Sequence, residues 1–94
     1  MIKSKIGKPA VLEQLAEECC ELAQISLKRA RILRGENPTP KTITETDANF
    51  LEEIADVLVC ISVIADNQDM MNKIWDIQDK KLNRWKKRIM EMKK

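Results

Sequence analysis

Histidine is absent from this 94-residue chain, and aromatic residues make up only 3% of it. Without histidine the chain lacks the commonest zinc ligand and the usual general base, and every Ser-His-Asp or Cys-His arrangement is excluded. Any catalysis must therefore use carboxylates, lysines or a metal ion. The scarcity of aromatics, with only two glycines and three prolines, favours an all-helical fold over a sheet.

The sequence also argues against disulfide bonds and against insertion into a membrane. Three cysteines do not make a disulfide framework, and the neighbours Cys19 and Cys20 would point about 100° apart on a helix, which opposes a bond between them. The longest apolar run, Val57–Ala65, is much shorter than the ~20 residues that span a bilayer, and the N-terminus has no apolar signal core. We therefore expect a cytoplasmic protein without a membrane partner.

The length predicts one small domain over residues 1–94. A chain of this size buries only about 60–65% of the surface that it exposes when unfolded, so we expect association with another copy. The net charge is only +2, yet residues 80–94 carry eight basic residues against one acidic residue. A local basic cluster of this kind can hold phosphates whatever the overall charge.

Helix start and stop signals divide the chain into three main helices. Pro9 suits a first helical turn and Gly35 a helix end, which predicts a helix over about residues 9–34. "TITE" (residues 42–45) has the capping-box pattern and predicts a second helix that runs to about Asp66. "DNQD" then breaks the pattern before a third helix. Outside these helices we expect an N-terminal arm at residues 1–8 and a connector at 35–42, and residues 80–94 form the basic end of the third helix.

In each predicted helix, apolar and polar residues are separated into distinct stripes or segments. Nine residues of the first helix share one apolar stripe: Val11, Leu12, Leu15, Cys19, Leu22, Ala23, Ser26, Ala30 and Leu33. The second half of the second helix is apolar on nearly every side, which predicts a buried central helix. Its first half carries a polar stripe of Asn49, Glu53, Asp56 and Cys60. The third helix has a stripe of Met71, Ile74, Trp75, Gln78, Leu82, Trp85, Ile89 and Met92.

Four carboxylates form two pairs at helical spacing. Glu18 and Glu21 share one face of the first helix, and Glu53 and Asp56 share one face of the second. If the pairs face each other they form a cage of four, in which like charges disfavour ionisation unless a hard divalent cation is bound. All-oxygen ligands point to Mg²⁺ or Mn²⁺. A solvated charged face is the alternative, and spacing alone leaves both open.

Two further groups of residues have a functional and a plain interpretation. Lys81, Arg84 and Arg88 either bind substrate phosphates or form a solvated helix end, where cations are favoured. Cys60, one turn after Asp56, either lines the pocket or only packs, and we expect Cys19 and Cys20 to be small packing residues. The two tryptophans are expected to be core or subunit contacts.

Two segments of this sequence resemble a known family. "EECCEL" (residues 17–22) and "EEIADVL" (residues 52–58) match the pattern EExxEL followed by ExxD. This pattern is typical of the MazG-like nucleoside triphosphate pyrophosphohydrolases, and the chain is most similar to their short members from phages and prophages. The resemblance covers about residues 10–90, although "KKLNRWKKR" matches the family's third helix only loosely.

The resemblance implies an all-α fold in which helices of two or more subunits form a bundle, as a homodimer or homotetramer. It implies hydrolysis of a nucleoside triphosphate, a dNTP or a non-standard NTP, to the monophosphate and pyrophosphate, with Mg²⁺ as cofactor and Mn²⁺ as a substitute. The metal ligands would be Glu18, Glu21, Glu53 and Asp56. Either Glu21 or Glu53 would also orient the attacking water, and Lys81 and Arg84 would neutralise the leaving pyrophosphate.

The sequence also fits two alternative functions. One is a related all-α hydrolase with a narrower substrate, such as phosphoribosyl-ATP, dUTP or dCTP. The other is a non-enzymatic helical oligomer whose basic C-terminus binds nucleic acid or a partner helix. The lack of aromatic stacking residues and the acidic first helix argue against a nucleic-acid partner.

Overall fold

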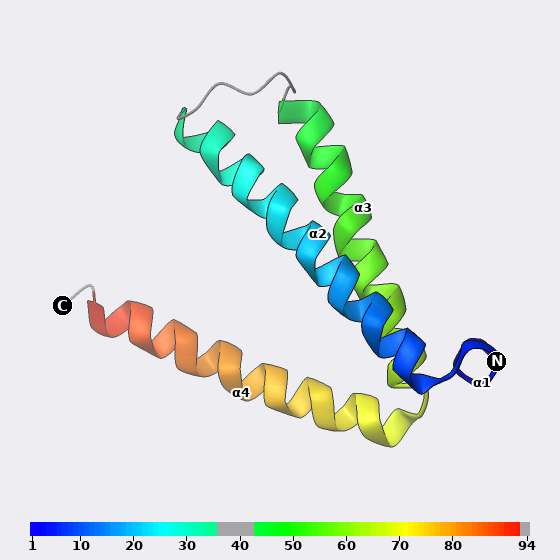
Figure 1. Cartoon of the computed structure of the whole chain (residues 1–94). Helices are drawn as coiled ribbons and strands as arrows, with labels where there is room; N and C mark the ends of the chain where they lie inside the picture. The colour runs from blue at the N-terminus through cyan, green and yellow to red at the C-terminus, as the bar shows by residue number, and fades with distance from the viewer. Residues whose placement is uncertain (36–42, 93–94) are drawn as a thin grey trace. The chain divides into compact units, whose positions relative to one another are not determined.

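The computed structural model describes residues 1–35 and 43–92. All regular structure in these residues is α-helical, in the order α1 (Ile2–Ile6), α2 (Lys8–Arg34), α3 (Ile43–Ile64) and α4 (Gln68–Met92) (Figure 1). The predicted all-α fold is thereby confirmed. The chain divides into two compact units, residues 1–64 and 65–94. Within the described ranges, no helix is both long and apolar enough to cross a bilayer.

Local signals set the bounds of α2. Pro9 lies in the first turn, where its missing N–H costs nothing. Gly35 ends the helix at φ 72°, a left-handed conformation that glycine adopts without strain, and its N–H donates to the carbonyls of Arg31 and Ile32. The observed start at Lys8 is one residue before the predicted one, and the predicted end at Arg34 is confirmed.

The N-terminal residues contain a short helix where the sequence predicted an arm. α1 ends at Gly7, whose φ of 90° turns the chain into α2. The Lys3 ammonium group donates a 3.0 Å hydrogen bond to the Ile64 carbonyl. That carbonyl lies in the last turn of α3, where backbone acceptors have no partner within the helix. Lys3 therefore ties the start of the unit to the end of α3.

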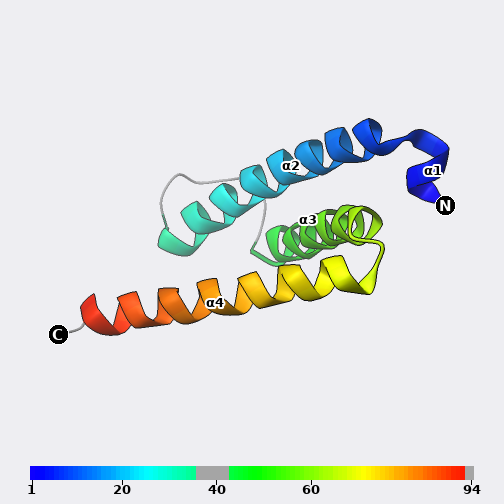
Figure 2. The same cartoon turned by 90° about the horizontal axis from the view of Figure 1, so that it is seen from below.

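The core of the first unit is a single seam between α2 and α3. The two helices run antiparallel and lie side by side in both views (Figures 1 and 2). Val11 and Ile25 of α2 and Cys60 of α3 are buried in this seam. On α2 the covered residues recur every three or four positions, and the half-buried members include Leu15, Glu18, Leu22 and Arg29. Two charged residues therefore lie within the stripe that contacts α3.

The predicted apolar stripe of α2 was partly wrong. Ile25 was left out of it but is buried, whereas Leu12, Cys19, Ala23 and Leu33 are exposed. The prediction that α3 is buried all round was also wrong, since Leu58 and Val59 are 57% and 58% exposed. Both differences have one cause. Among the described residues of this unit, each long helix packs against the other as its one long neighbour, so part of its surface remains uncovered.

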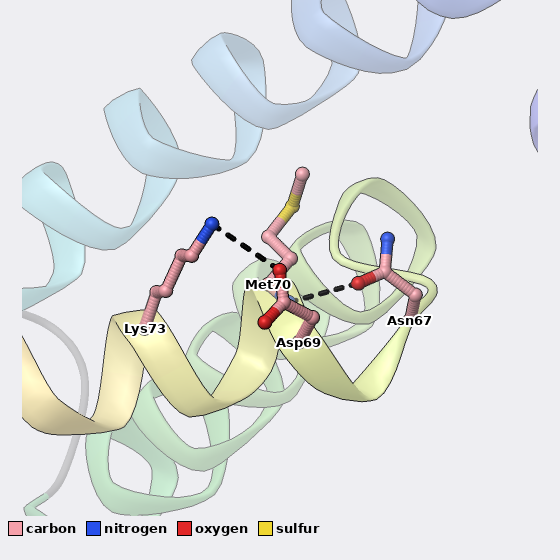
Figure 3. Close-up of polar contacts among 4 residues, drawn as sticks. All are labelled: Asn67, Asp69, Met70 and Lys73. Carbon is pink, nitrogen blue, oxygen red and sulfur yellow. Dashed lines mark hydrogen bonds and ion pairs between the residues drawn. The ribbon is translucent and has the colours of Figure 1, made fainter.

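The second unit contains α4, which begins at Gln68, inside the "DNQD" segment that was predicted to precede the helix. The Asn67 side-chain oxygen accepts a 2.8 Å hydrogen bond from the Met70 N–H and caps the helix (Figure 3). Asp69 lies in the first turn, where negative charge is favoured, and pairs with Lys73 at 3.2 Å. The connector at residues 36–42, and with it Thr42 of the predicted capping box, lies outside the described residues.

Candidate metal centre

Three of the four predicted carboxylates converge between α2 and α3. Glu18 and Glu53 are half-buried and Asp56 is exposed. One oxygen from each of the three lies within 4.8 Å of the others. Because Glu18 belongs to α2 and the other two to α3, the group forms only when the two helices pack against each other. We call Glu18, Glu53 and Asp56 the carboxylate triad.

Two oxygens of the triad are buried without a hydrogen-bond partner in the described structure. They are Oε2 of Glu18 and Oε2 of Glu53. The other Glu18 oxygen accepts a 2.8 Å hydrogen bond from the Gln14 amide. A buried carboxylate oxygen that lacks a donor has lost its water without compensation, which is energetically costly. Among the described residues, no hydrogen-bond donor therefore reaches these two oxygens.

The pKa of Glu18 is raised above its ordinary value. Burial raises the pKa of the carboxyl group, and the negative charges of Glu21 and Asp56 raise it further. The hydrogen bond from Gln14 acts in the opposite direction and lowers the pKa, because it stabilises the ionised form. The balance is a rise, so the position disfavours the charge that a metal ligand must carry.

The donor set and spacing fit a hard divalent cation. Mg²⁺ binds oxygen ligands at about 2.0–2.1 Å, so two ligands on opposite sides of the ion are about 4 Å apart. Three ligands of one octahedral ion include pairs at right angles, about 3 Å apart, so triad oxygens within 4.8 Å of one another would have to approach one another by up to about 2 Å. Three protein ligands would leave positions for water and for substrate oxygens, as is usual for Mg²⁺.

Glu21, the fourth predicted ligand, lies beside the triad. Its carboxylate is not among the oxygens that meet within 4.8 Å. It is exposed, but it is close enough for its charge to raise the pKa of Glu18. It also lines a groove of ≈ 290 Å³ together with Glu53. Glu21 is therefore positioned next to whatever the triad binds.

This groove, which we call the α2–α3 groove, contains residues that the sequence interpretation did not assign to a site. Its lining is Glu21, Gln24, Ile25, Lys28, Asn49 and Glu53. Asn49 was recognised as part of a polar stripe, whereas Gln24 and Lys28 were missed. A sequence signal existed, because residues 21, 24, 25 and 28 repeat at helical spacing from Glu21.

Cys60 is buried one turn after Asp56 and does not line the groove. Burial raises the pKa of its thiol, and the charges of Glu18 and Asp56 raise it further, so the thiol stays protonated. The packing interpretation therefore fits Cys60. It fails for Cys19 and Cys20, which are both exposed.

The predicted phosphate-binding residues belong to the other unit. Lys81, Arg84 and Arg88 are exposed on α4. Lys81 and Arg84 line a shallow hollow on that helix together with Ile77 and Lys80. Their role at the triad stays a prediction.

An ion pair joins α2 and α3 near the groove. The Arg29 guanidinium pairs with the Asp47 carboxylate, and it also lies over the Phe50 ring at 5.6 Å from the ring centre. Both contacts cross from α2 to α3, and Arg29 is next in sequence to Lys28 of the groove. The pair therefore helps to fix the two walls of the groove relative to each other.

No family model, curated protein or solved structure matches this chain.

Proposed function

We propose that this protein is a cytoplasmic, MazG-like nucleoside triphosphate pyrophosphohydrolase that depends on Mg²⁺, with Mn²⁺ as a substitute. The observation that supports it best is the carboxylate triad. Glu18, Glu53 and Asp56 converge from two helices, and two of their buried oxygens have no partner in the described structure. Such an arrangement is costly alone and favourable around a divalent cation.

The chain's residues divide the work of such a reaction. The triad holds the metal, which when bound neutralises phosphate charge and polarises phosphorus–oxygen bonds. Glu21 or Glu53 orients the attacking water and accepts its proton, since both lie beside the groove. The rigid seam between α2 and α3 keeps these groups in place, and positioning is a large part of catalysis in phosphoryl transfer.

The first experiment is pyrophosphate release from a panel of canonical and modified NTPs and dNTPs, with Mg²⁺, with Mn²⁺ and with EDTA. We expect release with either metal, a monophosphate as the second product, and no release with EDTA. Glu53→Gln should lower the rate by at least about 100-fold, because it removes a ligand charge. Glu52→Gln is the matched control, since Glu52 is the exposed neighbour outside the triad.

Two results would contradict the proposal. One is the absence of pyrophosphate release from every nucleotide by a folded sample. The other is equal activity of Glu53→Gln and the unmodified chain. Mg²⁺ should also raise the thermal midpoint of the unmodified chain, because a ligand that binds the folded state stabilises it.

A second candidate function is an interaction module, and one observation favours it. α4 presents an apolar hollow of ≈ 500 Å³, lined by Ile74, Ile77, Gln78, Lys81, Leu82 and Trp85. A hollow of this kind suits the apolar face of a partner helix. A module of this class should bind its partner regardless of millimolar Mg²⁺, and binding to DNA or RNA should weaken steeply with salt.

We also propose that the active form is a homodimer or homotetramer. Large apolar residues are exposed on both α3 and α4, among them Leu58, Val59, Trp75 and Trp85. Exposed large apolar residues, on each of these helices taken by itself, are typical of a subunit interface. The four exposed side chains lie on two helices, so more than one contact surface is available for association.

A further inference from the structure

The α2–α3 groove adjoins the carboxylate triad, and its lining changes from acidic to basic along its length. Glu53 belongs to both, so the groove adjoins the triad and offers room for a ligand that the triad holds. Along α2 the groove runs from Glu21 to Lys28, seven residues or about 10 Å away. Along the antiparallel α3 the same direction leads from Glu53 back to Asn49. The groove is thus acidic beside the triad and cationic at the other end.

We propose that Lys28 binds the leaving diphosphate of the substrate. This inference rests on the proposed function. Lys28 is the one basic residue among the described residues that line the groove. Its flexible ammonium group is a suitable point charge for phosphate oxygens. The side-chain amides of Gln24 and Asn49 line the same end and can donate hydrogen bonds to the same oxygens.

Arg29, the next residue, cannot bind the diphosphate without losing its contacts with Asp47 and Phe50. Arg29 is paired with Asp47 and stacked over Phe50, which orders the groove's far end. Lys81 and Arg84, which the sequence assigned to the leaving group, belong to the separate unit of residues 65–94. Lys28 is instead fixed by α2 itself, two helical turns from Glu21, in the unit that contains the triad.

The leaving diphosphate, which Lys28 contacts, carries more negative charge in the transition state than in the substrate. A bond forms between the water oxygen and the α-phosphorus, and the water's proton passes to Glu21 or Glu53. The bond between the α-phosphorus and the α,β-bridging oxygen breaks, and its electron pair stays on that oxygen. Negative charge therefore grows on the leaving diphosphate, and a cation at this position accelerates its departure.

The test compares Lys28→Met with the unmodified chain in hydrolysis of the best nucleotide of the panel and in product inhibition. We expect kcat/KM to fall about 10- to 100-fold in the variant. The inhibition constant of inorganic pyrophosphate with Mg²⁺ should rise about 10-fold or more. That of the nucleoside monophosphate should change less than about twofold, because this product does not reach Lys28. Calorimetric titration with Mg²⁺ and pyrophosphate should show the same loss of affinity.

Controls separate a binding role from a structural one. Lys28→Arg keeps the charge and should restore most of the pyrophosphate affinity, whereas Lys28→Gln should not. Lys8→Met removes a distant exposed lysine of the same helix and should have no effect. Equal weakening of pyrophosphate and monophosphate, or unchanged pyrophosphate inhibition, overturns the role of Lys28 alone. An unmodified chain that neither hydrolyses a nucleotide nor binds pyrophosphate overturns the proposed function together with it.

Discussion

The surroundings of Glu18 disfavour its ionised form when no metal is bound. It lies in the seam between α2 and α3, has a buried oxygen without a partner in the described structure, and has a raised pKa. A carboxyl group whose pKa is higher in the folded state binds more protons when folded than when unfolded. The folded state therefore loses stability as the pH rises above the ordinary range of a glutamate, up to the raised pKa. At neutral pH the ionised group opposes folding, and a cation would reverse this.

Glu18→Gln should therefore raise the thermal midpoint at neutral pH in EDTA, because it removes the desolvated charge and still accepts the bond from Gln14. The same substitution should remove the stabilisation by Mg²⁺. Thermal unfolding across a pH series, with and without metal, measures both effects. At acidic pH, where Glu18 is protonated, the two chains should unfold alike. Glu13→Gln, on the exposed face of α2, is the control. A lower midpoint for Glu18→Gln in EDTA would contradict the assignment.

At the scale of helices, Arg29 links α2 to α3 by two polar contacts. Its guanidinium pairs with Asp47 and covers Phe50. The Arg29 side chain is 27% exposed and that of Asp47 is 47% exposed, so solvent screens part of the attraction. We expect Arg29→Met to lower the free energy of unfolding by about 1–2 kcal/mol, from the cation–π contact and the partly screened pair together.

Urea denaturation of Arg29→Met, Asp47→Asn and the double variant measures this link. The coupling energy of the pair should be about 0.5–1 kcal/mol and should decrease in high salt. Fully additive effects would show that the two residues do not stabilise each other. Lys8→Met again controls for the loss of a cation from α2.

Helix signals were readable from the sequence because they are local. Pro9 and Gly35 act within one turn of their own positions, and the predicted bounds of α2 match the observed ones within one residue. Asn67, which caps α4, was predicted only as part of a break. The carboxylate pairs were also readable, since i, i+3 spacing places two side chains on one face. The spacing of residues along one helix does not determine how that helix is rotated about its axis relative to its neighbour. That rotation brings Glu18 but not Glu21 into the triad, and it puts Lys28 into the groove.

Apolar faces were harder to interpret for the same reason. Burial depends on how many neighbours a helix has, and the sequence pattern of α3 suited a helix covered on all sides. The described unit gives it one long neighbour, so Leu58 and Val59 stay exposed. The pattern thus indicates more burial than residues 1–64 provide by themselves. Association with a further copy would account for this difference.

At the scale of the whole molecule, α4 carries the clearest signal for association. Its apolar stripe recurs alternately every four and three residues, which is the spacing of a helix–helix seam. The members at this spacing are Met71, Trp75, Gln78, Leu82, Trp85, Ile89 and Met92, and Ile74 of the predicted stripe lies next to Trp75 in sequence. Trp75 and Trp85 are 52% and 64% exposed. Tryptophans at such positions are typical anchors of an interface, because they bury much apolar area.

We therefore expect light scattering at micromolar concentration to give the mass of a dimer or tetramer. Tryptophan emission should shift to longer wavelength when dilution dissociates the assembly. Leu82→Asp places a charge within the stripe and should raise the dissociation constant by about 30- to 150-fold, which corresponds to about 2–3 kcal/mol. Asn83→Asp adds the same charge one residue away, off the stripe, and should leave the mass unchanged. A monomeric mass with tryptophans already shielded from water would mean that the stripe is covered within one chain, and the oligomeric proposal would then be wrong.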